Sequence, residues 1–385
     1  MTIGILGGGQ LGYMLALAGY PLGLHFRFLD PSPEAPVGRI AQRVTAEYSD
    51  HDALEKFVHG LELITYEFEN VPVSAVRFLA KHVPVYPPAE ALEAAQDRLN
   101  EKTLFNMLGI ATTSFAEVNG AGDVDAAVKK IGLPAVLKTR RMGYDGKGQW
   151  VLRTREDVEF VKREFPTTPL LLENFVAFQR ELSILAVRSR SGETAFYPLV
   201  ENHHRGGILR LSIAPVPNLG AKLQHAAESA ARRVMEELNY VGVLAIEFFE
   251  CNGELVANEM APRVHNSGHW SIEGAATSQF ENHLRAVLGM PLGSTATVGV
   301  SAMVNLIGEV PEEKDVLAIA DAHLHLYGKS LRPGRKVGHV TLRAESSEGL
   351  SSRLAELPAF FHRDEFCLRG HASEHGLRKA SARKA

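Results

Sequence analysis

A predicted β-hairpin over residues 245–266 constrains the fold more than any other segment, because it places acidic side chains inside apolar strands. Two apolar runs flank a Cys-Asn-Gly turn, and Glu247 and Glu259 interrupt these runs. Burying a carboxylate without a partner costs several kcal/mol, so the fold must bring a cation to both acids. A hard cation that also binds phosphates suits them best. The pattern therefore predicts a catalytic hairpin.

The register of this hairpin decides whether the two acids meet. A two-residue Asn-Gly loop would pair Glu247 with Asn258 and send Glu259 to the opposite face of the sheet. A three-residue loop with a glycine bulge would instead pair Glu247 with Glu259. We expect the bulged loop, because it lets both carboxylates reach one cation. An exposed hairpin with incidental acids is the alternative.

The composition is that of a globular protein with more than one domain. The 385 residues exceed one ordinary core, and a hydrophobic fraction of 45% supports a packed interior. A formal charge of -4 gives no basic surface for nucleic acid or an anionic membrane. Cys251 and Cys367 are too few for a disulfide framework. We expect a cytoplasmic protein whose partners are small molecules, with no nucleic acid and no membrane among them.

The pattern of predicted elements divides the chain into four parts. Residues 1–110 alternate short apolar runs with helix-like segments, which is typical of an α/β domain of βαβ units, and one helix over residues 89–108 closes it. Residues 111–190 read as a separate α+β unit. Residues 191–310 contain the acidic hairpin, and residues 311–385 form a last, small unit with predicted strands.

A Gly-x-Gly-x-x-Gly pattern occupies residues 7–12, directly after a predicted strand and before a predicted helix. Such glycines let the backbone approach a phosphate, and the N-terminus of a helix favours an anion. Asp30 ends the next strand, where an acid would bind the ribose of a dinucleotide. Taken alone, this pair predicts an NAD-dependent dehydrogenase, and a plain tight turn is the alternative.

Two segments of the second part are typical of a nucleotide site. Lys138 ends a strand, and the glycine-rich, cationic residues 140–149 that follow can cover phosphates. They do not form a Walker motif. The apolar strand 170–173 runs into a linker at 174–176, which can offer backbone groups to an adenine edge, and Glu181 can hold ribose hydroxyls. A flexible basic hairpin and an ordinary strand end are the respective alternatives.

A basic loop over residues 327–339 surrounds a Pro-Gly turn. Its five basic or imidazole side chains lie within eleven positions, so they can clamp an anion. A solvated basic loop without a ligand is the alternative.

In this order, the segments resemble the ATP-grasp superfamily, and within it the family of 5-(carboxyamino)imidazole ribonucleotide synthases. The resemblance covers nearly the whole chain. It rests on Gly-Gly-Gly-Gln-Leu-Gly at 7–12, Glu-Phe-Glu-Asn-Val at 67–71, Asp-Arg at 97–98, Gly-Tyr-Asp-Gly-Lys-Gly-Gln at 143–149, Asn-Glu-Met-Ala-Pro-Arg-Val-His-Asn-Ser-Gly-His-Trp at 258–270 and Arg-Pro-Gly-Arg-Lys-Val-Gly-His at 332–339.

This resemblance implies a fold of mixed α/β and α+β character. Residues 1–110 would form the N-terminal βαβ, or pre-ATP-grasp, domain, which binds the ribonucleotide phosphate. Residues 111–190 and 191–310 would form the lid and catalytic halves of a two-part ATP-grasp core, and residues 311–385 a small β-rich C-terminal subdomain. It also implies an ATP-dependent carbon–nitrogen ligase of de novo purine biosynthesis and a homodimer.

The resemblance assigns ATP to the space between the second and third parts and Mg²⁺ to Glu247 and Glu259. Many relatives have an Asn two residues after the second acid, where this chain has Ala261, so Asn258 is the nearest candidate for a third ligand. The ATP-binding residues implied are Arg98, Lys138, Gly143, Gly146, Lys147, Gly148, Gln149, Glu173, Asn174, Phe175, Val176, Glu181, His204 and Asn258.

The implied reaction carboxylates the exocyclic amine of 5-aminoimidazole ribonucleotide. Bicarbonate, the co-substrate, attacks the γ-phosphoryl group of ATP, and the carboxyphosphate formed releases carbon dioxide to the amine. Arg263, His265 and Asn266 would hold carboxyphosphate, while Asp145 and Tyr144 would orient or deprotonate the amine, with Glu67 or Glu69 as lesser candidates. The ribonucleotide-binding residues implied are Gly8, Gly9, Gln10, Leu11, Glu67, Lys329, Arg335 and Lys336.

Three alternatives remain at this point. The chain could be another ATP-grasp ligase, such as a formate-using transformylase or a biotin-type carboxylase. It could be the NAD-dependent dehydrogenase indicated by residues 7–12, although that leaves the acidic hairpin unexplained. It could also be a regulator that binds ATP without turnover.

Overall fold

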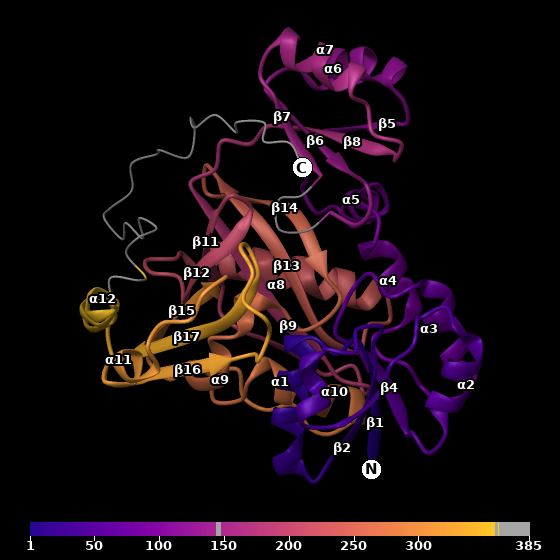
Figure 1. Cartoon of the computed structure of the whole chain (residues 1–385). Coiled ribbons are helices and arrows are strands. Elements are labelled where there is room, and N and C mark those ends of the chain that lie inside the picture. The colour runs from indigo at the N-terminus through magenta and orange to yellow at the C-terminus, as the bar shows by residue number, and fades with distance from the viewer. Residues whose placement is uncertain (144–147, 359–360, 362–385) are drawn as a thin grey trace.

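The computed structural model describes residues 1–143, 148–358 and 361 of the chain. Within these ranges the strands form three sheets, of four, nine and four strands. In Figure 1 the N-terminal sheet lies at the lower right, the large sheet at the centre and the third sheet at the top. Among the residues described, no helix combines the length and apolar character that crossing a bilayer requires.

The N-terminal sheet is parallel, in the order β3-β2-β1-β4, as the alternating pattern predicts. Since β1, β2 and β4 end at one edge, Gly7, Asp30 and Glu67, which follow them, meet there. The elements are β1 (Thr2–Leu6), α1 (Gln10–Gly19), η1 (Tyr20–Leu22), β2 (His25–Leu29), η2 (Pro36–Arg39), β3 (Gln42–Val44), α2 (His51–Val58), β4 (Leu63–Tyr66) and α3 (Val73–Leu79).

The single helix expected over residues 89–108 is wrong, because two helices, α4 (Ala89–Ala95) and α5 (Arg98–Met107), take its place. Asp97 between them is extended, and its carboxylate accepts the N–H of Leu99 at 3.0 Å, which caps α5. The same carboxylate pairs with Arg140 at 2.8 and 2.9 Å. The break makes Arg98 the first residue of α5.

The third sheet has the order β5-β8-β6-β7, and α6 and α7 pack their apolar sides on it. Lys138 lies near the end of β6, so the glycine-rich segment begins at this edge. The elements are β5 (Phe115–Val118), η3 (Ala121–Asp123), α6 (Val124–Ile131), β6 (Ala135–Thr139), β7 (Gln149–Leu152), α7 (Arg155–Arg163) and β8 (Leu170–Asn174).

The large sheet follows the order β14-β13-β9-β11-β12-β15-β17-β16, with β10 paired to β9. Its C-terminal strands therefore extend the sheet that carries the hairpin. The strands are β9 (Arg180–Arg188), β10 (Thr194–Phe196), β11 (Val200–Arg205), β12 (Ile208–Ala214), β13 (Gly242–Cys251), β14 (Glu254–Ala261), β15 (Val300–Ile307), β16 (Ala322–Leu326) and β17 (Lys336–Ala344). The helices are α8 (Ala221–Glu237), η4 (Asn266–Gly268), α9 (Ser271–Gly274), α10 (Gln279–Leu288), α11 (Glu313–Leu317) and α12 (Ser347–Glu356).

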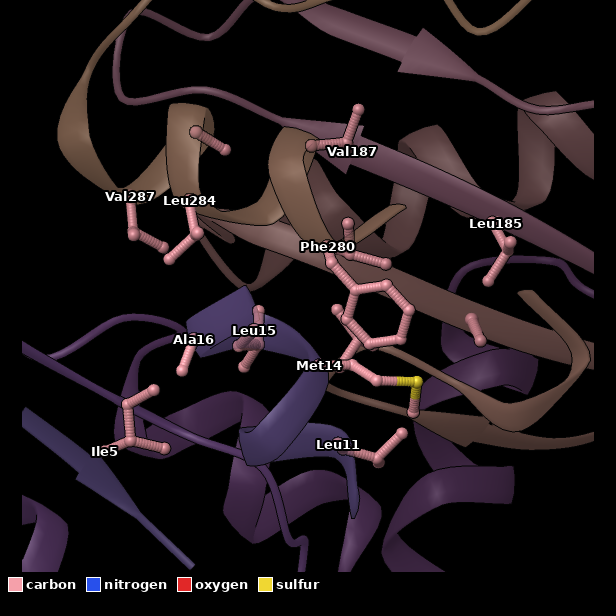
Figure 2. Packing of buried hydrophobic residues seen from close by; sticks show 14 of the residues in the cluster. Ile5, Leu11, Met14, Leu15, Ala16, Leu185, Val187, Phe280, Leu284 and Val287 are labelled. Carbon is pink, nitrogen blue, oxygen red and sulfur yellow. The ribbon is translucent and has the colours of Figure 1, made fainter. Parts of the chain in front are cut away.

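A shared core fixes the N-terminal domain on the large sheet. Figure 2 shows Met14 of α1 beside Phe280 of α10, and Leu15 and Ala16 of α1 on the side of Leu284, with Leu185 of β9 in the same cluster. Burial of each such side chain contributes about 1.5–3 kcal/mol. The N-terminus of α1 is therefore held at a set position relative to the sheet that carries the acids.

The hairpin pairs Glu247 with Glu259, as expected, but by another device. The expected three-residue loop is wrong, because Cys251 pairs with Glu254 and only a two-residue Asn-Gly turn lies between the strands. The register instead shifts within the ladder: Phe248 pairs with Ala257, and Asn258 is the extra residue of a bulge.

Candidate active site

Residues from all three sheet regions line one cavity. The sequence-predicted residues in its wall are Gln10, Leu11, Glu69, Arg98, Gly143, His204, Glu247, Glu259, Arg263, His265, Asn266 and Lys336. The predicted residues outside its lining are Gly8, Gly9, Glu67, Lys138, Gly148, Gln149, Glu173, Asn174, Phe175, Val176, Glu181, Asn258, Lys329 and Arg335. Tyr144, Asp145, Gly146 and Lys147 lie outside the described residues.

The two hairpin acids lie opposite each other in the cavity wall. Burial and the nearby Glu259 carboxylate raise the pKa of Glu247 to about 7. Burial also opposes ionisation of Glu259, but Arg98, whose Nη1 lies 2.8 Å from Glu259 Oε2, outweighs it and lowers the pKa to about 2. Like charges this close favour binding of a further cation.

This donor set fits Mg²⁺ that is bound together with phosphates. Within the described ranges, no group of three His, Cys, Asp or Glu side chains could hold a metal by itself. Mg²⁺, however, needs only one or two carboxylates when water and substrate phosphates fill its other positions. Glu247 and Glu259 supply that number. Asn258 Oδ1 is buried and has no hydrogen-bond partner among the described residues, so the adjacent amide stays a candidate ligand.

A buried carboxylate between two lysines lies beside the hairpin. Glu173 Oε2 lies 3.1 Å from Lys138 Nζ and 3.2 Å from Lys102 Nζ, and Thr113 Oγ1 donates to it at 3.1 Å. Burial opposes ionisation of Glu173, but the two lysines outweigh it and lower its pKa to about 2. Burial lowers the pKa of Lys138, against the opposing effect of Glu173. The Glu173 carboxylate is therefore charged and fixes the ammonium groups of Lys102 and Lys138 by ion pairing.

The predicted adenine linker has two of its amides occupied within the protein. The N–H of Asn174 donates to the carbonyl of Ser114 at 3.0 Å, and the N–H of Phe175 donates to that of Pro134 at 3.2 Å. Val176 follows them. Its amide is thus the candidate donor of this segment for the expected adenine edge.

His204 on β11 forms an ion pair with Glu181 on β9. Its Nδ1 lies 2.5 Å from Glu181 Oε2. Burial alone would lower the pKa of His204, but the hydrogen bond and charge of Glu181 raise it to about 9, with smaller effects of Glu247 and Glu259. His204 is therefore a second cation beside the acids at neutral pH.

The segment after β14 places a cation, a neutral imidazole and an amide in the cavity wall. Arg263 pairs with Glu69. Burial, followed by the charges of Arg263 and Lys336, lowers the pKa of His265 to about 3, and its Nε2 lies 3.5 Å from Glu247 Oε1. Asn266 exchanges two hydrogen bonds with Asn305, at 2.7 and 3.1 Å. This polar wall suits a bound oxyanion.

The glycine fingerprint is closed by two of the protein's own carboxylates. The N–H of Gly8 donates to Asp30 at 2.6 Å, and that of Gly9 donates to Glu67 at 2.8 Å. A Cβ on Gly9 would lie 2.7 Å from Glu67 Oε1. A pyrophosphate would meet negative charge here, which argues against the dehydrogenase alternative. The Gly8 and Gly9 amides, which were expected to contact the phosphate, are thus already bonded within the protein.

The basic loop reaches the start of α1. Lys329 donates to the side chain of Gln10 and lies 5.8 Å from the centre of the Tyr327 ring. Lys336 lines the cavity, as does Gln10. Arg335 donates to Ser330 Oγ at 2.6 Å. The loop and α1 thus meet at one end of the cavity.

Sequence reasoning missed two further charged residues at the site, Glu101 and Lys102. Glu101 lines the cavity, and burial together with the Glu259 charge raises its pKa to about 8. Lys102 is not in the cavity lining and is fully buried, whereas Arg140, from the predicted segment 140–149, lines the cavity. The sequence contained one signal for them. Glu101 and Lys102 lie three and four positions after Arg98, so the three side chains share one face of a helix.

Three family models match the chain. They describe a ribonucleotide synthetase preATP-grasp domain at residues 1–96, an ATP-grasp domain at 103–280, and a phosphoribosylaminoimidazole carboxylase C-terminal domain at 301–353. The N5-carboxyaminoimidazole ribonucleotide synthase of Pseudomonas aeruginosa is 56% identical over 359 residues, which cover 93% of this chain and 99% of the relative. The chain belongs to the N5-carboxyaminoimidazole ribonucleotide synthase family.

Solved structures of N5-carboxyaminoimidazole ribonucleotide synthases have the same fold. That of Thermus thermophilus is 61% identical with a TM-score of 0.89, and the match covers 92% of this chain and 97% of that one. The Aspergillus clavatus enzyme in complex with ADP and 5-aminoimidazole ribonucleotide is 29% identical with a TM-score of 0.87, covering 94% and 98%. These matches confirm the predicted family resemblance and fold class.

In this family member, the His204 imidazole should titrate near pH 9. Because its pKa is raised from 6.5, its pairing with Glu181 contributes stability that is fully present below that value and is lost as pH rises through about 9. Glu181→Gln should drop the pKa below 6.5, since burial then dominates. NMR titration of His204 in both proteins measures this, with Glu237→Gln, at the exposed end of α8, as the control. An unchanged pKa in Glu181→Gln would contradict the assignment.

Proposed function

We propose that the chain carboxylates the exocyclic amine of 5-aminoimidazole ribonucleotide at the expense of ATP and bicarbonate. The products are 5-(carboxyamino)imidazole ribonucleotide, ADP and phosphate, in de novo purine biosynthesis. Relatives at 56% and 61% identity carry the corresponding synthase name. A further relative has been solved with ADP and 5-aminoimidazole ribonucleotide together.

The observation that carries this proposal is the shared cavity. Glu247 and Glu259 line it together with Gln10 and Lys336. The acids suit a cation on the phosphates of ATP, whereas the first turn of α1 and the Lys336 ammonium suit a second anion. One cavity with both features provides for two phosphate-bearing substrates.

The chemistry needs charge neutralisation more than a covalent intermediate, because phosphoryl transfer passes through a loose transition state. Arg98 and His204 contribute positive charge. Lys138 and five residues of the glycine-rich segment 140–149 are assigned to the phosphates: Gly143, Gly146, Lys147, Gly148 and Gln149. Mg²⁺ held by Glu247 and Glu259 would neutralise further charge on the γ-phosphoryl oxygens.

The polar wall after β14 is assigned to carboxyphosphate, with Arg263 as the cation and His265 and Asn266 as hydrogen-bonding groups. His265 is neutral at physiological pH because its pKa lies near 3. A neutral imidazole can donate a hydrogen bond to an oxyanion without transferring its proton. Orientation of the substrate amine is assigned to Asp145 and Tyr144, which lie outside the described residues.

Two further assignments complete the proposal. A cytoplasmic location agrees with the low cysteine count, and Cys251 is a free thiol. The homodimer rests on the family resemblance alone.

Measuring phosphate release with ATP, bicarbonate and the ribonucleotide omitted in turn tests the function. We expect full release only with all three present, and formation of the carboxylated ribonucleotide in step with phosphate. Activity with formate in place of bicarbonate, or with biotin in place of the ribonucleotide, would assign a different ATP-grasp reaction.

Glu259→Gln should keep the fold and lose most ATP turnover. Glutamine can still accept a hydrogen bond from Arg98, but loss of one carboxylate charge removes a metal ligand and weakens the hold of Mg²⁺ on the phosphates, so turnover should stay low even at saturating magnesium. Turnover measured across a magnesium titration checks this, with Glu254→Gln on the exposed end of β14 as the matched control. Near-normal turnover at saturating magnesium would contradict the metal assignment.

Arg335→Ala should weaken the ribonucleotide and spare ATP. A guanidinium fork on phosphate contributes about 1.5–3 kcal/mol, so affinity should fall roughly 10- to 150-fold. Calorimetric titration with each ligand measures both, and Arg332→Ala in the same loop is the control. If the mutation weakens ATP and leaves the ribonucleotide unchanged, the two sites have been assigned in the wrong order.

A further inference from the structure

Three charged side chains on one face of α5 hold three consecutive residues of β14. All three are buried, with exposed fractions of 9%, 2% and 0% for Arg98, Glu101 and Lys102. The contacts join Arg98 to the Glu259 carboxylate, Glu101 to the N–H of Met260 and Lys102 to the carbonyl of Asn258, at 2.8, 2.6 and 3.2 Å between donor and acceptor.

These contacts pair backbone groups on the outer edge of β14. β14 lies at the end of the large sheet, so its outer backbone groups have no neighbouring strand. Buried backbone groups must nevertheless be paired. The N–H of Ala257 donates to the carbonyl of Ala111 at 2.7 Å, and side chains of α5 serve the next groups along the edge.

Asn258 is the residue that most needs such a partner. As the extra residue of the bulge it has no opposite residue on β13. The bulge is also what brings Glu259 opposite Glu247, because a regular ladder continuing from Phe248 and Ala257 would place Asn258 there. Whatever fixes the Asn258 carbonyl therefore fixes the register of the acid pair.

Lys102 is well placed to do this. Its ammonium bridges Asn258 O and Glu173 Oε2, each at 3.2 Å. A fully buried ammonium is costly unless it is paired, so Glu173 on β8 determines where the lysine points. Lys102 does not line the cavity, and it therefore acts on the hairpin and not on a ligand.

We propose that Lys102 is a positioning residue for the metal site. It holds the bulge at Asn258 so that Glu259 stays opposite Glu247. The inference rests on the proposed function, because it takes this acid pair as the magnesium site.

The test measures ADP affinity by calorimetry with and without Mg²⁺, in wild type and in Lys102→Met. The methionine fills the same space but cannot donate to the Asn258 carbonyl. We expect the gain in ADP affinity that Mg²⁺ provides to fall about tenfold or more, as for loss of other groups that orient metal ligands. ADP affinity without Mg²⁺ should remain at the wild-type value.

Two matched variants separate the bulge contact from other effects. Lys102→Gln loses the charge but keeps a donor for Asn258, so it should retain the magnesium-dependent gain. Thr113→Val removes another partner of Glu173 Oε2, at 3.1 Å, without touching the bulge, so it should retain the gain as well. If Lys102→Met does not fold, Lys102→Leu, which also has no donor for the Asn258 carbonyl, takes its place.

Each outcome is decisive. Equal losses in the methionine and glutamine variants would mean that the lysine charge matters and would overturn the proposal. A loss in the glutamine variant alone would overturn it as well, because the methionine variant, which has no donor for the Asn258 carbonyl, would then have kept the gain. A loss of ADP affinity that is the same with and without Mg²⁺ would overturn it too. A wild-type protein that gains nothing from Mg²⁺ would overturn the magnesium assignment and the role of Lys102 with it, whereas a gain that persists in Lys102→Met overturns the role of Lys102 alone.

Discussion

Glu247 and Glu259 share one ladder position of the β13–β14 pair, where burial and their mutual repulsion both oppose ionisation. The cations that answer them come from separate parts of the chain: Arg98 from α5, His204 from β11 and Lys336 from the start of β17. Both acids can thus be buried as carboxylates only when the N-terminal helices, the catalytic sheet and the C-terminal strands have assembled around them. The ionisation of these two carboxylates therefore depends on cations from separate parts of the fold.

The glycine loop shows how far a backbone motif can mislead when its surroundings are ignored. The geometry that lets amides approach an anion is present, but Asp30 and Glu67 supply the anions from the ends of neighbouring strands. Burial raises the pKa of Glu67, while the N–H groups of Gly9 and Gly12 oppose this shift. The fingerprint here serves the packing of α1 against the sheet, and it leaves the first turn of α1, at Gln10 and Leu11, as the part that faces the cavity.

Local patterns predicted the elements and the pairing of the acids, but not the means of that pairing. The alternating βαβ pattern expected in residues 1–110 is present as a parallel sheet with helices between its strands, because such periodicity is a property of the segments themselves. The loop length was wrong because the bulge at Asn258 depends on Lys102, which lies 156 positions away in the sequence. The break before Arg98 depends likewise on Arg140 in another domain. Such partners cannot be read from spacing alone.

The C-terminal strands belong to the same hydrogen-bonded sheet as the acidic hairpin, and Lys336 pairs with Ile307 at the start of β17. Under the proposed function, Lys336 binds the phosphate of the acceptor, and Glu247 and Glu259 hold the metal on ATP. All three residues thus belong to one rigid sheet. The distance between the phosphate site and the ATP site is therefore fixed by the sheet. In a compound whose amine lies one bond nearer to its phosphate, or one bond farther, the amine would be misplaced relative to the carboxyl group that it must attack. The site therefore selects the acceptor by the distance between its amine and its phosphate, independently of contacts to its ring.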